Sequence, residues 1–155
     1  MKEKSCAFTG HRELPTGTEL ILLTEKLERS IKELTDRGYT DFYAGGALGF
    51  DTLCALTVLK LRYKGVPVKL NLLLPYRGQE GSWSKMDKKI YADILSLADR
   101  VEYVGEEYTK SCFFKRNRAL VDNSSVLINF LRKPQSGTAQ TVNYAKKCAL
   151  ELISL

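Results

Sequence analysis

The sequence predicts an α/β domain with a mainly parallel five-stranded sheet and helices on both of its faces. Short apolar runs alternate strictly with longer segments of helical periodicity, which is the pattern of parallel strands joined by crossover helices. The chain has 155 residues, enough to bury a core without support from metals or disulfides. No low-complexity tract or Gly/Ser/Pro-rich linker divides it. We therefore expect residues 1–155 to form a single domain.

The first strand and the first helix follow from the spacing of their apolar residues. Residues 5–9 form an apolar run that predicts a strand. The segment after it has apolar residues at the spacing of one helix face: Leu20, Leu23, Leu27, Ile31 and Leu34. Thr16 and Glu19 have the spacing of a capping box at the start of this helix. Gly38 supplies the left-handed residue that commonly ends a helix.

The same pattern repeats in four further strand–helix units. We expect strands at residues 41–44, 68–74, 100–104 and 126–131, and helices at residues 51–64, 85–98, 112–122 and 138–152. The helix at residues 51–64 is apolar on nearly all sides, so we expect it to be well buried. The five units together predict a Rossmann-like three-layer α/β/α sandwich.

The composition excludes several classes of protein. No stretch approaches the roughly 18 apolar residues of a membrane helix and no signal peptide is recognisable, so we expect a cytoplasmic protein without a membrane partner. Four cysteines stand far apart without a C-x-x-C pair, which predicts reduced thiols and no metal site: Cys6, Cys54, Cys112 and Cys148. Because His11 is the only histidine, a catalytic triad that needs a histidine would have to use it.

The net charge of +6 gives weak support for nucleic acid as a partner. The chain has 24 Lys and Arg residues against 18 Asp and Glu residues. Protein contacts with phosphate come largely from Lys and Arg. Here the basic residues occur at most in pairs and are interleaved with acids, so a solvated surface explains most of them.

The loops after the five strands carry the candidate ligand-binding residues. In an open parallel sheet the ligand crevice lies outside the carboxyl ends of the strands, where helix N-termini converge. We predict that these loops bind a small ligand, with no cofactor required, through Gly10, His11, Arg12, Gly45, Gly46, Gly49, Asp51, Pro75, Tyr76, Gln79, Arg116, Arg118, Ser136, Gly137 and Thr138.

Several of these residues also have a purely structural interpretation. The glycines at residues 45–49 either bring backbone amides close to an anion or merely make a tight turn. Asp51 would repel a phosphate, so a ligand-binding role would place it against a ribose hydroxyl or a base edge. Ser136 and Thr138 either cap a helix or leave its end amides to a phosphate.

The arginines, the histidine and the aromatic residues leave similar alternatives. Arg116 pairs with a phosphate or lies on a solvated face, and Arg118 binds ligand or pairs with Asp122 four residues later. We interpret His11 as a ligand-facing residue, because it lies in a loop away from any apolar face. One loop contains the two aromatic side chains that could stack on a base of a small ligand: Tyr76 and Trp83.

Five motifs, one for each of the five loops, resemble a known superfamily when they are taken in order. They are Gly10-His11-Arg12, the segment 45–51, Pro75-Tyr76 with Gln79, Arg116-Asn117-Arg118 with Val121, Asp122 and Ser124, and Ser136-Gly137-Thr138. In this order the chain resembles the YpsA-like and YoqJ-like bacterial proteins of the SLOG superfamily, the Rossmann-like group that also includes DprA and the LOG phosphoribohydrolases. The resemblance covers nearly the whole chain. It implies a pocket for nucleotides or nucleotide-derived ligands, ADP-ribose-like ones included.

One difference from the LOG enzymes bears on catalysis. Those enzymes carry a P-G-G-x-G-T-x-x-E motif whose glutamate is catalytic. When the G-T of this motif is aligned with Gly137-Thr138, Thr141 stands at the glutamate position. A threonine has no carboxylate to stabilise an oxocarbenium-like centre or to activate water. LOG-type hydrolysis is therefore not expected unless Asp51 takes over from another loop.

We therefore expect a sensor or regulatory module that binds a nucleotide or nucleotide-derived small molecule. The first alternative is an enzyme that cleaves the N-glycosidic bond of a nucleotide, with Asp51 or His11 as the catalytic acid or base. The second is a protein that binds single-stranded DNA, by analogy with DprA. A homodimer formed through an exposed apolar helix face is a further expectation.

Overall fold

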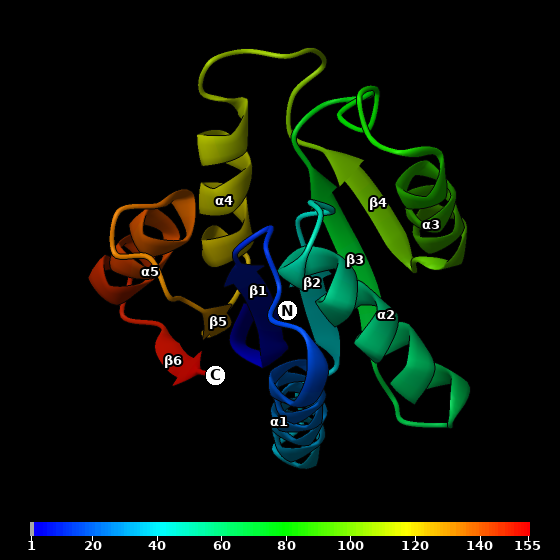
Figure 1. The fold of residues 1–155 in the computed structure, drawn as a ribbon. Helices are drawn as coiled ribbons and strands as arrows, with labels where there is room; N and C mark the ends of the chain where they lie inside the picture. Colours follow the sequence, from blue (N-terminus) through cyan, green and yellow to red (C-terminus); the bar gives the residue numbers. More distant parts are fainter. Residues whose placement is uncertain (1) are drawn as a thin grey trace.

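The structure is a computed structural model that describes residues 2–155, and its centre is a six-stranded parallel sheet (Figure 1). The strands are β1 (Ser5–Gly10), β2 (Asp41–Ala44), β3 (Lys69–Leu74), β4 (Arg100–Tyr103), β5 (Val126–Phe130) and β6 (Glu151–Ser154). They lie in the order β4-β3-β2-β1-β5-β6, and every neighbouring pair is parallel. The Rossmann-like three-layer fold is as the sequence predicts, with one strand more than the five expected.

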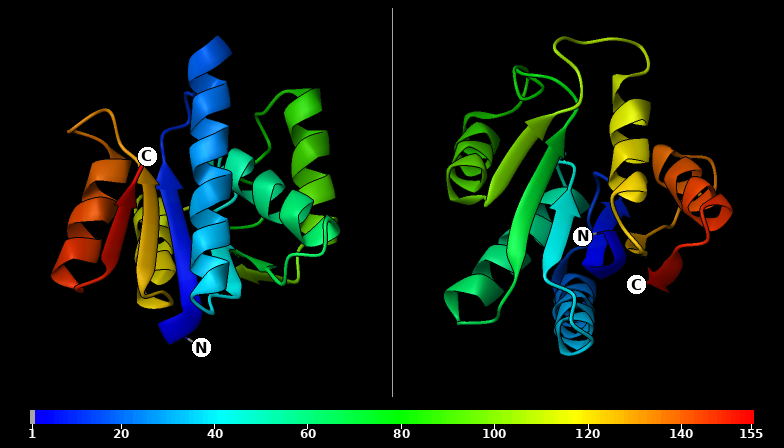
Figure 2. Two further views of the ribbon diagram at one scale, coloured as in Figure 1. Left: turned by 90° about the horizontal axis from the view of Figure 1, so that it is seen from below. Right: turned by 180° about the vertical axis from the view of Figure 1, so that it is seen from behind.

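Five helices cover the two faces of the sheet. They are α1 (Gly17–Asp36), α2 (Phe50–Tyr63), α3 (Lys85–Leu97), α4 (Cys112–Asp122) and α5 (Gly137–Lys147), after a short 3-10 turn η1 (Lys2–Lys4). Side chains of successive strand residues point to opposite faces. Phe8 of β1 therefore packs in the core under α1, α2 and α3, whereas its neighbour Ala7 packs in the core under α4 and α5. Figure 2 shows α4 and α5 side by side on their face of the sheet.

The expected last helix at residues 138–152 is wrong in its second part. Helix α5 ends at Lys147, and Ala149 has a left-handed backbone with φ of 60° that stops further helical turns. The chain then enters β6, whose Leu152 lies opposite Leu127 of β5. Leu152 and Ile153 pack against opposite faces of the sheet, which is the two-residue period of a strand.

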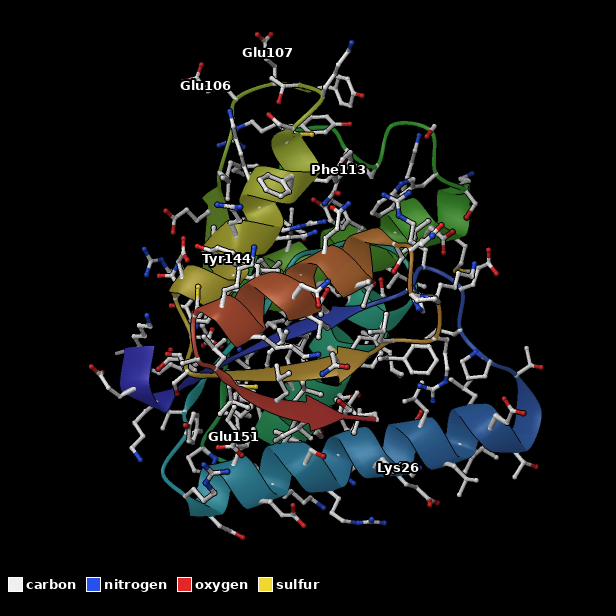
Figure 3. All side chains as sticks on the ribbon, turned by 90° about the vertical axis from the view of Figure 1, so that its left-hand side faces the viewer. Lys26, Glu106, Glu107, Phe113, Tyr144 and Glu151 are labelled. Carbon is white, nitrogen blue, oxygen red and sulfur yellow. The ribbon has the colours of Figure 1, made fainter. Side chains whose placement is uncertain are left out.

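Helix α1 follows the prediction closely except at its cap. Its apolar stripe is buried from Leu23 to Leu34, and Gly38 has the left-handed φ of +92° expected after a helix. The side chain of Thr16 makes no capping hydrogen bond, so the expected capping box does not form. The exposed carboxylate of Glu151 on β6 joins this end of the helix to the sheet edge by accepting two hydrogen bonds from Arg37, at 2.7 and 2.9 Å (Figure 3).

Helix α2 is less buried than its composition predicts. Phe50 and Val58 are fully buried against the sheet, but Leu56 is 45% exposed. All four cysteines are unpaired. Within residues 2–155 no helix is long and apolar enough to cross a membrane.

Candidate functional site

A cavity of about 240 Å³ opens at the carboxyl end of β1, between the glycine loop, α4 and the start of α5. We call it the central cavity. It lies where an open parallel sheet is expected to bind its ligand. Its lining residues are Phe8, Thr9, Gly10, His11, Arg12, Ala47, Asp51, Phe113, Arg116, Asn117, Leu120, Ser136, Gly137 and Thr138.

The N-terminus of α5 forms one wall of the central cavity. The hydroxyl of Ser136 accepts a hydrogen bond from the amide of Ala139 at 3.1 Å and donates one to the carbonyl of Lys133 at 2.8 Å. Ser136 is therefore the helix cap that was one of its two expected roles. A helix leaves its first amides without helical partners. Among residues 2–155, no acceptor is recorded for the amides of Gly137 and Thr138, which line the cavity.

Opposite charges face the cavity from the glycine loop side. The guanidinium of Arg116 is only 5% exposed and donates to the carbonyl of Gly45 and, at 2.8 Å, to the side-chain oxygen of Asn117. The carboxylate of Asp51 is 7% exposed and accepts from the amide of Ala47 at 3.1 Å. Burial raises the pKa of Asp51, and the nearby positive charge of Arg116 opposes that rise.

The side chains of Arg116 and Asp51 influence each other's charge without direct contact between their charged groups. No direct ion pair between them is recorded within the described chain. Burial also lowers the pKa of Arg116, while Asp51 opposes that change. A buried cation whose hydrogen bonds go to neutral oxygens is costly to hold unless a charged group balances it. Asp51 balances one positive charge, but the cavity lining contains two arginines, Arg12 and Arg116, so it can still accept an anion.

His11 lines the cavity but is already bonded within the protein. Its Nε2 atom accepts hydrogen bonds from two successive amides, those of Arg132 at 2.8 Å and Lys133 at 3.1 Å. Its ring packs edge-on against Phe130, with 6.0 Å between the ring centroids. Burial and the charges of Lys133 and Arg132 lower the pKa of His11, and Glu13 opposes them. Nε2 is thus occupied and is not free to act as a catalytic base in this arrangement.

The glycine loop is shaped by contacts within the protein. A β-carbon on Gly46 would lie 2.4 Å from Leu74, and one on Gly49 would lie 2.1 Å from the carbonyl oxygen of Arg12. Both glycines have positive φ, +74° and +78°, which other residues rarely adopt. Gly45, Gly46 and Gly49 do not line the cavity. This placement favours the tight-turn interpretation of the loop over close approach to a ligand.

Several other predicted site residues also lie outside the lining of the central cavity. Pro75 belongs to the neighbouring β3 loop, where its carbonyl accepts from Gly105 at 3.1 Å. Gln79 is buried and donates to the carbonyl of Gly46 at 3.3 Å and to the hydroxyl of Tyr91 at 3.1 Å. Trp83 packs on Tyr91 with 5.1 Å between the ring centroids. These contacts hold the loops in place.

Arg118 does not form the expected pair with Asp122. Its guanidinium lies between the rings of Phe114 and Tyr144, 4.5 and 4.4 Å from their centroids. Asp122 instead accepts a hydrogen bond from the hydroxyl of Tyr144 at 2.7 Å. Arg118 is exposed, joins α4 to α5 through these two rings and does not line the central cavity.

Phe113, an aromatic residue at the central cavity, is not among the site residues predicted from the sequence. Phe113 has the guanidinium groups of Arg12 and Arg116 each 5.8 Å from its ring centroid. Tyr76 does not line the cavity but packs edge-on against Phe113, at 6.2 Å. The other lining residues outside the prediction are Phe8, Thr9, Ala47, Asn117 and Leu120.

A periodicity signal could have found part of this wall. Phe113, Arg116, Asn117 and Leu120 recur at the spacing of one face of α4. One face of the helix expected at residues 112–122 therefore predicts Phe113 and Asn117 as site residues together with Arg116.

The central cavity has few carboxylate side chains that could act in catalysis. Asp51 is the one carboxylate among its lining residues. Thr141, at the position of the LOG glutamate, is buried and donates its hydroxyl to the carbonyl of Gly137 at 2.9 Å. Within the described residues, no cluster of three or more His, Cys, Asp and Glu side chains could hold a metal ion.

Two solved structures share this fold. DprA from Streptococcus pneumoniae superposes with a TM-score of 0.73 at 20% identity over 98% of this chain and 50% of its own length. DprA from Helicobacter pylori, described by its single-stranded DNA binding mode, gives a TM-score of 0.70 at 20% identity over 99% of this chain and 65% of its own. The chain thus spans half to two thirds of these proteins, and the likeness shows the fold alone.

Sequence relatives place the chain more narrowly. The SPbeta prophage-derived protein YoqJ of Bacillus subtilis is 31% identical over 144 residues, covering 84% of each chain. A UPF0398 protein of Listeria welshimeri is 26% identical over 143 residues, covering 86% of this chain and 79% of its own. The model of the YspA SLOG family matches residues 6–151. The chain therefore belongs to the YspA SLOG family.

Proposed function

We propose that this protein binds a nucleotide or nucleotide-derived small molecule in the central cavity. One observation carries the proposal: the unpaired amides of Gly137 and Thr138 and the buried guanidinium of Arg116 line the same cavity. Helix N-terminal amides and arginine are both favourable partners for phosphate oxygens. The exposed Arg12 at the same cavity adds a second positive charge.

The rest of the cavity suits the other parts of a nucleotide. Asp51 would repel a phosphate, but its carboxylate can accept a hydrogen bond from a ribose hydroxyl. The ring of Phe113 offers an apolar face on which a base can stack. A mixture of phosphate, hydroxyl and ring partners is the chemistry of a nucleoside phosphate or an ADP-ribose-like ligand.

A binding role fits the carboxylates better than hydrolysis does. Thr141 replaces the LOG glutamate and bonds within its own helix, which leaves Asp51 as the single carboxylate among the described residues at the cavity, whereas glycosidic hydrolysis commonly uses a pair. We infer a sensor or regulatory module in the cytoplasm, where its unpaired cysteines would stay reduced. Homodimer formation stays a prediction.

Single-stranded DNA is the second candidate ligand. An aromatic cluster continues outward from the cavity: Tyr76 packs on Phe113 at 6.2 Å and on Tyr108 at 5.8 Å, and Tyr108 is 61% exposed. Exposed aromatic rings beside basic residues are typical of single-strand binding. The fold shared with DprA agrees with this candidate.

Calorimetric titration with AMP, ADP-ribose and inorganic phosphate tests the proposal. We expect AMP or ADP-ribose to bind, and Arg12→Ala to weaken binding because it removes a charge at the cavity. Arg118→Ala is the matched control, because this arginine lies on α4 but outside the cavity. If no nucleotide binds to the wild type while oligonucleotides bind with a steep salt dependence, single-stranded DNA becomes the preferred ligand.

A further inference from the structure

The hydrogen bonds of His11 connect β1 to the start of α5. Nε2 of His11 accepts the amides of Arg132 and Lys133, the first two residues of the β5–α5 loop after Leu131. The carbonyl of Lys133 accepts the hydroxyl of Ser136, and Ser136 in turn caps α5. The backbone of Lys133 therefore links the imidazole ring to the helix N-terminus, with its amide bonded to His11 and its carbonyl bonded to Ser136.

These bonds require one protonation state of His11. An imidazole nitrogen that accepts hydrogen bonds carries no proton, so the neutral ring must have its proton on Nδ1. A proton on Nε2 would place three donors against one another with no acceptor between them. Protonation must therefore break the bonds to the amides of Arg132 and Lys133.

We propose that neutral His11 is a positioning residue that holds the β5–α5 loop, and that its protonation releases this loop and weakens anion binding at the start of α5. The proposal rests on the proposed function, because the amides of Gly137 and Thr138 are the groups positioned. It removes His11 from the candidate catalytic acids and bases and gives it a different role.

The surroundings of His11 favour the neutral ring. Lys133 and Arg132 face it from the loop, and Glu13 faces it from the segment after β1, paired with Lys133 at 3.8 Å. Phe130 of β5 contributes an apolar edge contact. Burial of the ring is the main cause of the lowered pKa of His11, and Lys133 and Arg132 add to it against the opposing effect of Glu13. Glu19 and Lys26 of α1 line a second cavity with His11 and carry one charge of each sign.

A charged His11 would also attract an anion, which opposes the effect of releasing the loop. The two effects predict opposite pH dependences. If loop release dominates, acid weakens binding, and if the added charge dominates, acid strengthens it. The geometry favours loop release, because both amide bonds depend on Nε2.

NMR titration of the ligand-free protein between about pH 5 and pH 8 tests the positioning role. His11 is the only histidine, so its ring signals are unambiguous. We expect the Nδ1–H tautomer at neutral pH and a pKa below the ordinary value. We also expect the amide signals of Lys133, Gly137 and Thr138 to move as His11 titrates. An Nε2–H tautomer, or amide signals that stay still, would overturn the positioning role.

Binding of ADP-ribose tests the consequence, because its phosphates do not titrate in this range. We expect the wild type to lose about tenfold in affinity from about pH 8 to pH 5, or about 1.4 kcal/mol. The matched variant is His11→Gln, whose side-chain oxygen can accept the same amides but does not titrate. It should bind more tightly than His11→Ala at pH 8 and show no pH dependence. His11→Ala should bind weakly at every pH.

The outcomes separate the two proposals. If no nucleotide binds to any variant, the proposed function fails, while the amide titration still decides the positioning role. If ADP-ribose binds but wild type and His11→Gln share one pH dependence, or if acid strengthens wild-type binding, the release on protonation is refuted and the proposed function stands.

Discussion

Replacing Gly46 by valine tests whether this glycine is needed for the fold or for binding a ligand. The loop sequence alone favours close approach of a ligand to the glycine backbone as readily as a tight turn. In the structure Gly46 has φ of +74° and does not line the central cavity. A β-carbon there would lie 2.4 Å from the side chain of Leu74 and 3.2 Å from that of Gln79.

The expected loss of stability follows from two costs. A branched residue forced into positive φ costs about 1–3 kcal/mol. Overpacking against Leu74 costs a further amount of about 1–3 kcal/mol. The free energy of unfolding should therefore fall by about 2–6 kcal/mol, which lowers the melting temperature of a chain this long by about 4–24 °C.

Gly65→Val is the matched control for this variant. Gly65 has a similar φ of +96°, but a β-carbon there meets nothing within 4 Å. It should show the backbone cost of about 1–3 kcal/mol without the overpacking cost. Thermal denaturation of both variants, with nucleotide affinity measured on the folded fraction, gives the comparison. A Gly46→Val protein that melts like the wild type yet binds no nucleotide would refute this reasoning and return the glycine to the ligand site.

Three other predictions concern α5, the cavity carboxylate and the histidine. Ala149→Gly should raise the free energy of unfolding by about 0.5–1 kcal/mol, because glycine adopts the left-handed backbone without strain. Urea denaturation measures this change, and a lower stability of the variant would contradict the left-handed end of α5. Chromatography should detect no free base after the wild type is incubated with AMP or NAD, and Asp51→Asn should alter the affinity for nucleotide only modestly. Release of base that Asp51→Asn abolishes would show that the protein is a glycosidase instead. Because the pKa of His11 is lowered in the folded state, its contribution to stability is complete above about pH 6.5 and is lost as the pH falls through the folded pKa. Urea denaturation of His11→Gln should lack this component, and identical pH profiles for variant and wild type would count against it.

Most of the fold could be predicted from the sequence because its apolar periods are clear. Residues 20–34 have an unambiguous helical stripe, and the run at residues 126–131 corresponds to β5. The end of the chain was misread because Ala145 and Leu152 fit one helical stripe. The left-handed backbone of Ala149 is unusual for alanine, and no sequence signal marks it.

The sequence predicts the edge of the sheet where the candidate site lies but not which side chains face the cavity. The rule that ligands bind at the carboxyl ends of parallel strands points to the edge of the sheet where the central cavity lies, and Arg12 and Ser136 line that cavity. It does not say which loop residues point inward. Whether Gly46 faces a ligand or Leu74, and whether His11 faces a ligand or the amide of Arg132, depends on tertiary contacts between distant segments.

The most direct test of nucleotide binding is a crystal structure of the wild-type protein grown with AMP. We expect electron density for the phosphate at the amides of Gly137 and Thr138, within hydrogen-bond distance of Arg12 or Arg116, with the base against Phe113. Density for AMP elsewhere on the surface, with this cavity filled only by solvent, would contradict the account.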